Sequence, residues 1–390
     1  MTAVRGVESF LVEGDSRKNW LFVKVATEDG VHGFGECYTA ADRERPIAAF
    51  VEELGRYLAG RDAFAIKHFT TVAYLDLVGK RGSMDFYSAL SGIEQALWDI
   101  AGKVTGQPVF NLLGGRCRDA VKVYANGWSY ASEFIRDEIA VAAERARGLV
   151  ERGFTALKFD PFPGPWRQHV TREEERSAVA CVAAVREAVG PDIDLLIEVH
   201  RRLAPANAIR LARMLEEYEP YWYEEPVSGR NVDALAEVRR ATRIPIVSGE
   251  ELYGKIEFRE LLERRAVDVI NPDVANCGGI LELKEIAAMA EPHLVAVAPH
   301  NYNSTTVALA ATIQAAATMP NFLITEYFVD AEERCREFVS HPLEPVGGVI
   351  ALPDGPGLGL DLDEERLARH TYTRYPLRRL RSPGDEPPGA

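Results

Sequence analysis

DLLIEVH (194–200) opens a series of five short apolar runs, each ending in an acidic residue or a histidine; the others are YWYEEP (221–226), PIVSGE (245–250), VINPD (269–273) and LVAVAPH (294–300). A helix-like segment follows each run, and parallel strands need such a crossover. Glu198, Glu224 and Glu250 recur every 26 residues, about one βα unit. In a closed barrel the carboxyl ends of all strands point to one face. We therefore expect these three carboxylates to converge there.

The three glutamates predict a metal site. A single acidic residue at a strand end is commonly a helix N-cap or a solvated loop charge. Three at equal spacing, each closing an apolar strand, favour a cation, because carboxylates held close together repel one another and a hard divalent ion removes that cost. Within the pair Glu224–Glu225, alternation along the strand turns Glu225 to the opposite side. Ligation by carboxylates alone indicates Mg²⁺, with Mn²⁺ as an alternative, rather than zinc.

Strand–helix alternation begins near Val121 and gives eight candidate strands up to FLITEYF (322–328). This rhythm is typical of a (β/α)8-type barrel. A doubly wound open sheet is the alternative, but the glycine-rich phosphate loop expected after its first strand is absent.

The residues before the barrel form a different unit. ESFLVE and NWLFVKVATEDG alternate as a β meander, EDGVHGFGE supplies glycines that we interpret as turns, and residues 46–104 have a helical pattern. Strand and turn material returns after about Leu343, which suggests that this end packs back on the N-terminal unit. We predict an α+β capping domain of residues 1–120 completed by 345–390, and a barrel of residues 121–344.

The overall composition limits the possible partners. The chain has 45 basic and 59 acidic residues, for a net charge of −14, so the phosphates of nucleic acid or of an anionic membrane would be repelled. No apolar run approaches the roughly 20 residues of a membrane span, and we identify no signal-peptide core at the N-terminus. Five scattered cysteines, none in a CxxC pair, are typical of a reducing cytoplasm.

Two histidines accompany the predicted metal ligands. His200 follows Glu198 by two residues, so both side chains should leave the same side of their strand. His300 ends the seventh strand and Asp273 the sixth, which allows the aspartate to orient the imidazole. A lone histidine at a strand end is more often structural. Two of them beside a metal cluster, one with an aspartate nearby, favour an acid and a base.

The second and eighth strands contribute further candidates. Lys158 and Asp160 in ALKFDP form another i, i+2 pair; Lys158 is either catalytic or an ion-pair partner of a neighbouring carboxylate. Glu326 in TEYF ends the eighth strand. It would hydrogen-bond to a substrate carboxylate if protonated, and a structural ion pair is the alternative.

The array resembles the mandelate racemase / muconate lactonizing enzyme family of the enolase superfamily over almost the whole chain. Glu198, Glu224 and Glu250 match its metal ligands, and NPDVANCGG with VAPH matches its aspartate–histidine dyad as Asp273 and His300. The resemblance implies a modified TIM barrel of the (β/α)7β type, a capping domain and homo-oligomeric assembly. It also implies a shared first step, in which a carboxylate substrate loses the proton next to its carboxylate to give an enolate stabilised by the cation.

Within this family the sequence is most similar to the acid-sugar dehydratases of the galactonate and gluconate type. Its second strand reads Lys158-Phe159-Asp160 where the racemases and muconate cycloisomerases have KxK, so the usual second lysine base is missing and cycloisomerisation of muconate is disfavoured. The histidine of EVH, with the runs KFDPF and EVHRRL, is similar to those dehydratases.

The resemblance therefore implies a mechanism for an aldonate-like acid sugar. His300, held by Asp273, would remove the C2 proton, and His200 would protonate the departing 3-hydroxyl to give a 2-keto-3-deoxy acid. Lys158 is the alternative base for an epimeric substrate. A racemase or epimerase with opposed bases, and a non-catalytic sugar-acid binding protein, are the other hypotheses. We expect loops at 17–20 and 38–42 to cover the barrel mouth.

Overall fold

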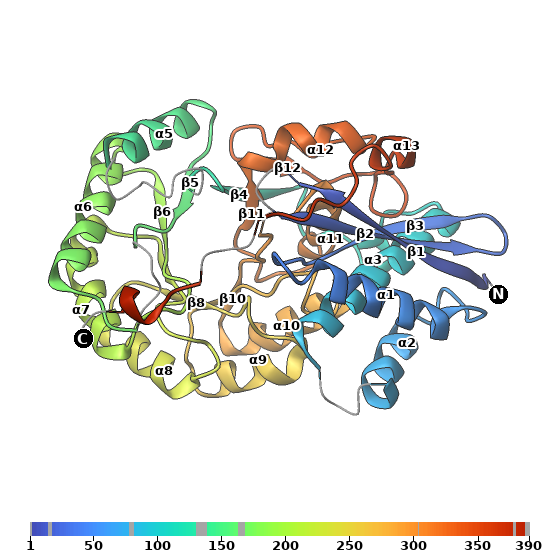
Figure 1. The fold of residues 1–390 in the computed structure, drawn as a ribbon, viewed down its shortest axis with the longest axis horizontal. Coiled ribbons are helices and arrows are strands. Elements are labelled where there is room, and N and C mark those ends of the chain that lie inside the picture. Colours follow the sequence, from blue (N-terminus) through green and yellow to red (C-terminus); the bar gives the residue numbers. More distant parts are fainter. Residues whose placement is uncertain are drawn as a thin grey trace.

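The computed structural model describes residues 2–14, 18–77, 82–129, 139–162, 168–302, 304–376 and 380–386. Its two parts lie side by side (Figure 1). The N-terminal part has an antiparallel sheet in the order β1 (Val4–Glu13), β2 (Asn19–Thr27) and β3 (His32–Cys37). Its helices are α1 (Glu44–Leu58), α2 (Ile66–Val72), α3 (Met84–Thr105) and α4 (Val109–Leu112), with a π-helical turn η1 (Ala73–Leu77).

Strand β2 separates two hydrophobic cores. Leu21, Val23 and Val25 pack with the helices of the N-terminal part, whereas Trp20 and Phe22 belong to the core that continues into the barrel. Successive side chains of a strand point to opposite faces, so the nearly continuous apolar run of this strand fills both cores. The N-terminal sheet is thereby built into the interior of the molecule.

The glycines of strand β3 differ from the sequence-based interpretation. Gly30 lies in a turn with φ +89°, as expected, but Gly33 and Gly35 lie within β3. A Cβ atom at Gly35 would come 2.0 Å from the carbonyl oxygen of Gly92 in α3, and one at Gly33 would come 2.2 Å from that of Ala96. These two glycines therefore allow helix α3 to pack directly on the strand, rather than forming a turn.

Eight parallel strands form the second part, at the eight predicted positions: β4 (Ala120–Asn126), β5 (Ala156–Phe159), β6 (Asp194–Glu198), β7 (Trp222–Glu224), β8 (Ile246–Ser248), β9 (Val269–Ile270), β10 (Ala296–Val297) and β11 (Thr325–Phe328). Their order is β10-β9-β8-β7-β6-β5-β4-β11. A parallel bridge between Val297 and Phe322 joins the two ends of this order. The strands therefore close into a barrel.

One helix follows each of the first seven barrel strands and covers the outside of the barrel (Figure 1). These helices are α5 (Ile139–Glu151), α6 (Arg172–Val189), α7 (Pro205–Leu215), α8 (Val232–Ala241), α9 (Gly254–Glu263), α10 (Ile280–Ala290) and α11 (Thr306–Ala316), with 3₁₀ turns η2 (Glu216–Tyr218) and η3 (Glu291–His293). Seven strand–helix pairs followed by a final strand confirm the predicted (β/α)7β class, and with it the capping domain.

The C-terminal segment contacts both parts. It contains η4 (Val329–Ala331), α12 (Glu332–Phe338), β12 (Val349–Ala351), α13 (Glu364–Leu367) and η5 (Pro383–Asp385). Strand β12 pairs antiparallel with barrel strand β4. Thr371 forms a bridge with Val12 of β1, and Leu358 donates its backbone N–H to Asp99 of α3 at 2.8 Å. The segment thus completes the cap, as predicted for the fold, and also extends the barrel sheet; the predicted domain boundaries stay a prediction.

Two glutamates of the cap lie at the N-termini of two barrel helices. Glu36 of β3 accepts hydrogen bonds from the backbone N–H groups of Thr305 and Ala308 at α11. Glu94 of α3 accepts them from Ile280 and Leu281 at α10. The first N–H groups of a helix have no partner within it, and the helix dipole favours a negative charge there. The cap is therefore docked by carboxylates that complete the ends of barrel helices.

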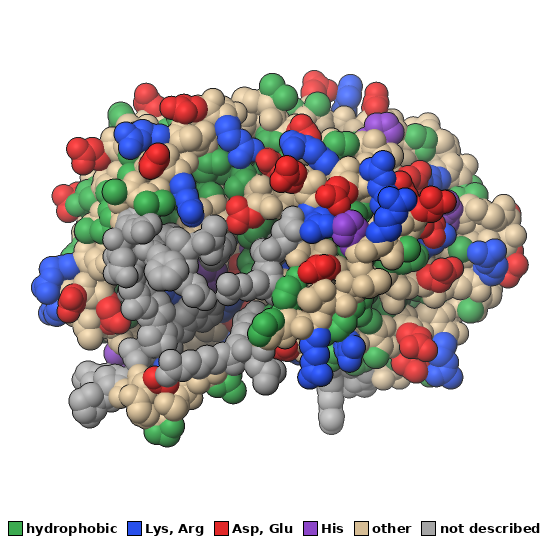
Figure 2. All heavy atoms as spheres, turned by 45° about the horizontal axis from the view of Figure 1, so that its top comes forward, with side chains coloured by type: hydrophobic (Ala, Val, Ile, Leu, Met, Phe, Trp, Pro, Cys, Tyr) green, Lys and Arg blue, Asp and Glu red, His purple; other side chains and the backbone are tan. Residues whose placement is uncertain are grey.

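Acidic and basic side chains are interspersed on the face shown in Figure 2. The described residues of that face form no large basic patch of the kind that nucleic acid or an anionic membrane attracts. Among the described residues, no helix combines the length and the apolar character of a membrane span.

Candidate active site at the barrel mouth

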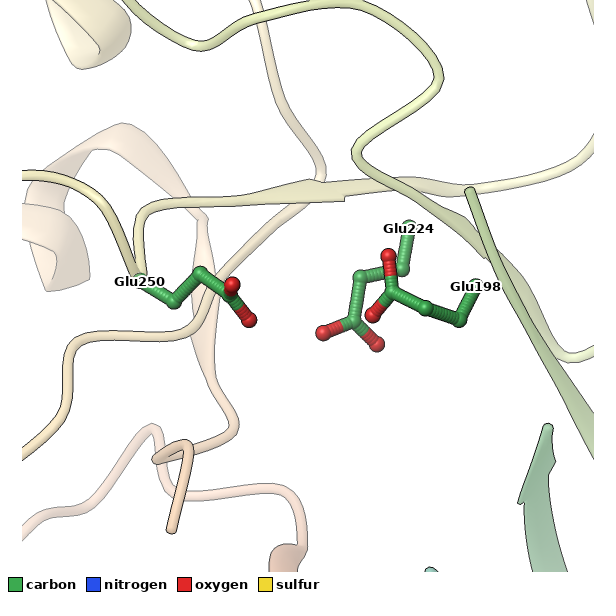
Figure 3. A group of neighbouring side chains, drawn as sticks. All are labelled: Glu198, Glu224 and Glu250. Atoms are coloured by element: carbon green, nitrogen blue, oxygen red, sulfur yellow. The ribbon is translucent and has the colours of Figure 1, made fainter. Parts of the chain in front are cut away.

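Three glutamates meet at the carboxyl ends of neighbouring strands (Figure 3). Glu198 and Glu224 are the last residues of β6 and β7 and are paired in register, and Glu250 lies two residues beyond the end of β8. One oxygen of each carboxylate lies within 4.8 Å of the others. The predicted convergence is thus present in the structure.

The environment of this cluster fits a hard cation. Glu198 Oε2 is buried and accepts no hydrogen bond from the described residues. Burial, together with the charge of Glu198, raises the pKa of Glu224 well above its usual range. A cation among the three carboxylates would accept the lone pairs of Glu198 Oε2 and would relieve the repulsion that, after burial, contributes to the raised pKa of Glu224. The residues present are therefore suited to bind a divalent metal ion.

Lys158 of strand β5 forms the ion pairs that the sequence left as one alternative. Its Nζ lies 2.9 Å from Glu224 Oε1, 3.0 Å from Glu326 Oε1 and 3.6 Å from Glu198 Oε2. Burial alone would lower its pKa, but these carboxylates raise the pKa of Lys158 well above its usual value. In this arrangement the side chain is an ammonium ion that neutralises part of the acidic cluster.

His300 and Asp273 form the expected pair. His300 Nδ1 lies 2.8 Å from Asp273 Oδ2, and its Nε2 lies 3.0 Å from Glu250 Oε2 and 3.5 Å from Glu326 Oε2. Burial acts to lower the pKa of His300, but Glu250 and Glu326 outweigh it and raise the pKa well above the usual value. One ring nitrogen is thus fixed by Asp273, and the other faces the carboxylate cluster.

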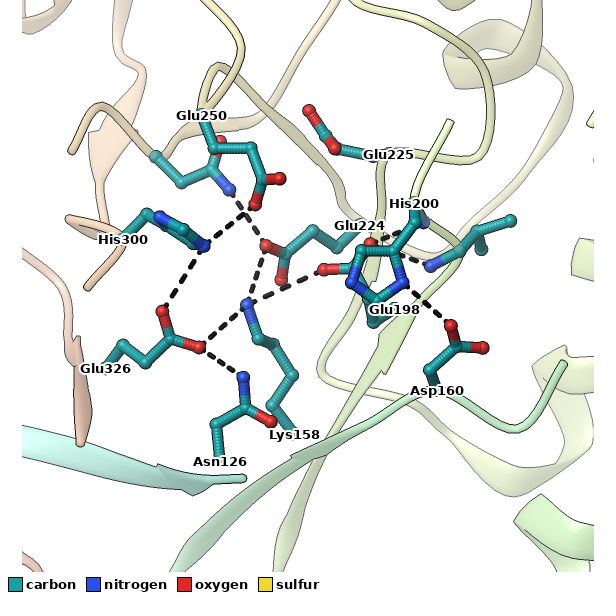
Figure 4. A network of polar contacts seen from close by, with 12 residues as sticks. Asn126, Lys158, Asp160, Glu198, His200, Glu224, Glu225, Glu250, His300 and Glu326 are labelled. Carbon is teal, nitrogen blue, oxygen red and sulfur yellow. Dashed lines mark hydrogen bonds and ion pairs between the residues drawn. The ribbon is translucent and has the colours of Figure 1, made fainter. Parts of the chain in front are cut away.

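His200 lies on the other side of the cluster (Figure 4). Strand β6 ends at Glu198, and His200 has φ +52°, so the i, i+2 rule for extended strands does not set the direction of its side chain. Its Nδ1 lies 2.7 Å from Asp160 Oδ2, and Arg202 donates to the same oxygen. Strands β6 and β10 are four positions apart in the eight-stranded order, which places His200 and His300 across the mouth from each other.

Of the two alternatives for Glu326, the structure supports the ion pair rather than a protonated carboxyl that donates a hydrogen bond. Burial would raise its pKa, but Lys158 and His300 lower it below the usual value. Its Oε2 accepts the backbone N–H of Asn301 at 2.8 Å, and Asn126 donates to its Oε1 at 2.5 Å. The carboxylate is therefore held ionised and oriented.

Several polar partners of the cluster were not predicted. Asn271 Nδ2 donates to Glu224 Oε1 at 2.8 Å, and Trp222 Nε1 donates to Glu224 Oε2 at 2.9 Å. Arg201 binds Glu225 and Glu250, so Glu225 is ion-paired, and it is not one of the three grouped carboxylates. Asn271 lies two positions before Asp273, and Trp222 lies two positions before Glu224. Side chains two positions apart on a strand share a face, so this alternation could have identified both residues from the sequence.

The cap reaches the mouth through Tyr38. Its backbone N–H donates to Ala275 at 3.0 Å, and its ring centroid lies 6.3 Å from that of His300. Tyr302 of the barrel stacks on His300 at 6.2 Å. Of the two expected covering loops, that at 38–42 therefore contacts the site, and Lys18 of the loop at 17–20 donates to the carbonyl oxygen of Tyr302 at 3.0 Å, whereas Arg17 lies outside the described residues.

Comparison with known proteins agrees with this geometry. Residues 11–114 match the mandelate racemase / muconate lactonizing enzyme N-terminal domain, and residues 141–366 match the enolase C-terminal domain-like family. The chain belongs to the mandelate racemase / muconate lactonizing enzyme family. The resemblance inferred from the metal ligands and the dyad is therefore confirmed.

Proteins with assigned names are similar to this one over most of the chain. The D-gluconate dehydratase of Thermoproteus tenax is 36% identical, over 95% of this chain and 74% of its own length. The D-galactarolactone cycloisomerase of Agrobacterium fabrum is 35% identical, over 90% of this chain and 91% of its own. A mandelate racemase/muconate lactonizing enzyme-like protein from Rubrobacter xylanophilus has a TM-score of 0.87 and 38% identity, over 96% and 99% of the two chains.

Proposed function

We propose that this enzyme is a magnesium-dependent hydro-lyase of an aldonate-like acid sugar. It would remove the C2 proton beside the carboxylate and expel the 3-hydroxyl, giving a 2-keto-3-deoxy acid. The observation that carries this proposal is the pair of aspartate-bound histidines, His300 and His200, on opposite sides of one carboxylate cluster. Dehydration needs one proton taken from C2 and another given to the hydroxyl oxygen on C3, and two separate imidazoles are suited to these transfers.

Glu198, Glu224 and Glu250 would hold the metal ion. When bound, the cation supplies positive charge where negative charge develops on the substrate carboxylate, which is the main electrostatic demand of removing a proton from a weak carbon acid. Lys158 lies in contact with the same cluster and would add a second positive charge near that carboxylate.

His300 would be the base that takes the C2 proton. Asp273 at Nδ1 fixes the tautomer and the ring orientation, so that Nε2 is the nitrogen that reacts. The imidazole must be neutral to accept a proton, and therefore the ion pair between Nε2 and Glu250 has to break before turnover. A positioned base of this kind typically contributes about 10²–10⁴-fold to the rate.

His200 would be the acid that protonates the leaving hydroxyl. The C3–O bond breaks, the hydroxyl leaves as water with the proton from His200, and the enol product tautomerises to the ketone. Asp160 holds the imidazole and Arg202 holds Asp160, so the acid has a fixed orientation on its side of the mouth.

An epimerase, racemase or cycloisomerase is the second candidate. The A. fabrum relative is named for cycloisomerisation, and removal of a proton at C2 would be common to these reactions. Lys158 would then be the opposed base. Its three ion pairs with carboxylates weigh against this role, because they stabilise the protonated amine.

The test is a screen of an acid-sugar library with Mg²⁺ in which the formation of 2-keto acids is measured. The same reactions in D₂O give the deuterium content of the recovered substrate. Formation of a 2-keto-3-deoxy acid supports the proposal. Deuterium in recovered substrate without loss of water would replace it with epimerisation, and binding with neither reaction would indicate a sugar-acid binding protein. We also expect a homo-oligomer in the cytoplasm, and sedimentation of the purified enzyme measures the former.

A further inference from the structure

Lys18 is a buried cation directly before cap strand β2. The residue is 4% exposed, and its Nζ donates to the carbonyl oxygen of Tyr302 at 3.0 Å. The same atom lies 5.3 Å from the ring centroid of Tyr38 and 4.9 Å from that of Tyr302. Among the described residues, no carboxylate lies within ion-pair distance of it.

The other buried lysine and arginine differ from Lys18. Among the described lysine and arginine residues, the other two that are buried are Lys158 and Arg202. Lys158 pairs with three carboxylates, and Arg202 pairs with Asp160. An unpaired ammonium is costly to bury, since its hydration is lost without an anion in exchange. The exception therefore indicates a place where an anion from outside the protein completes the pair.

The ammonium also remains charged near neutral pH. Burial lowers the pKa of Lys18 to about 8, against the opposing effect of more distant carboxylates such as Glu36 and Asp273. At pH 7 most molecules would therefore carry the charge. The carbonyl of Tyr302 takes one of its three N–H donors, and two rings provide only weaker cation–π contacts.

The position of Lys18 relates it to the reacting end of the site. Tyr38 and Tyr302, over whose rings its Nζ lies, both have their ring centroids within 6.3 Å of that of His300. His300 in turn contacts Glu250 of the metal-binding cluster. A substrate with its carboxylate at the glutamates and its C2 atom at His300 would extend from there toward the cap.

We propose that Lys18 is the specificity residue for the far end of the substrate, and that it binds a second carboxylate there. The preferred substrate would then be a two-ended acid sugar, an aldarate, rather than an aldonate that ends in a hydroxymethyl group. This inference rests on the proposed function for the chemistry at C2. It adds which acid sugar the site accepts, because a hydrogen bond from an ammonium to a carboxylate is stronger than one to a hydroxyl.

The test compares a hexarate and a hexonate with the same configuration at C2 to C5. Lys18→Met keeps the length of the aliphatic side chain and removes the charge. We expect it to reduce kcat/KM and binding affinity for the hexarate by about 10- to 100-fold, and those for the hexonate by less than about threefold. Lys24→Met is the matched control, since it removes a lysine of strand β2, which follows Lys18, and the partner of Lys24 is Glu364. Lys18→Gln is assayed in the same way, in case the methionine variant does not fold.

Calorimetric binding in the presence of Mg²⁺ separates this inference from the proposed reaction. A wild-type enzyme that binds the hexarate more tightly, with the preference lost in the variant, supports Lys18 even if no 2-keto acid forms. Equal losses for both sugars, no hexarate preference in the wild type, or a hexarate preference that survives in Lys18→Met and Lys18→Gln would overturn the role of Lys18 and leave dehydration standing.

Discussion

The Nδ1 atom of His200 lies 2.7 Å from Asp160 Oδ2, and across the barrel His300 makes the same kind of contact with Asp273 at 2.8 Å. Each carboxylate fixes the orientation of one imidazole. The sequence suggested only the second pair. Because acid and base act on different bonds, their deletions need not fail at the same step, and the two pairs can be tested separately.

We expect Asp160→Asn to reduce dehydration by about 10- to 100-fold while retaining exchange of the C2 proton with solvent. The reason is that Asp160 orients the acid and leaves His300 and the metal ligands in place. Product formation and deuterium incorporation at C2 are the two measurements. Asp194→Asn, which alters an ion pair with Lys122 at the other end of β6, is the control. A parallel loss of both activities would assign Asp160 a general structural role.

The two histidines should separate in the same assays. His300→Asn should lose both dehydration and C2 exchange, because it removes the base. His200→Asn should lose dehydration and keep some exchange, and Asp273→Asn should lie between the two. The exposed His341 provides a control substitution to asparagine. Exchange by the His300 variant equal to that of wild type would transfer the base role to Lys158, and loss of exchange in the His200 variant alone would reverse the roles.

Removal of one ligand should weaken the metal site. Chelation should abolish activity and Mg²⁺ should restore it. For Glu224→Gln we expect the affinity for Mg²⁺, measured by calorimetry, to fall roughly tenfold or more, since one of three anionic ligands is neutralised. Glu251→Gln, adjacent in sequence to a ligand but bonded to Ser228, should change it little. Full activity of Glu224→Gln with unaltered metal dependence would refute the ligand assignment.

Glu94 should make stability depend on pH. Burial outweighs the hydrogen bonds from Leu281 and Ile280, which lower the pKa, and raises the pKa of its carboxyl from the usual 4.5 to about 7. Between these values the native state therefore binds a proton that the unfolded chain releases. Its contribution to the free energy of unfolding therefore declines as pH rises through this window, by up to roughly 3 kcal/mol. In urea unfolding, the free energy of unfolding of the wild type should exceed that of Glu94→Gln by more at pH 5 than at pH 8. The opposite trend would mean that the N-terminus of α10 keeps the carboxylate ionised.

The strand positions and the three metal-ligand candidates could be predicted because they depend on local order. Each barrel strand is a short apolar run between helices, and parallel strands bring their carboxyl ends to one face. Glu198, Glu224 and Glu250 needed only those two facts. The pairing of His300 with Asp273 followed from strand adjacency in the same way.

The other features of the site and fold depend on contacts between residues far apart in sequence, which a local pattern cannot predict. His200 was placed with an alternation rule that stops where β6 ends, and its left-handed backbone turns it toward Asp160. Gly33 and Gly35 resemble turn residues in sequence, but their role is set by helix α3, some 60 residues later. Lys18 meets Tyr302 across 284 positions. Such relations between distant residues become visible only when the cap is seen on the barrel.

The glutamates at the starts of α10 and α11 limit how capping domains can be exchanged between relatives to change substrate preference. Glu36 and Glu94 belong to the cap, but the helix ends that they complete belong to the barrel, and those helices follow Asp273 and His300 in the chain. A transplanted cap without acidic residues at both positions would leave those helix ends unsatisfied next to the reacting groups. Grafts should therefore carry the two glutamates with them, and a library confined to residues 17–20 and 38–42 would change recognition without disturbing that junction.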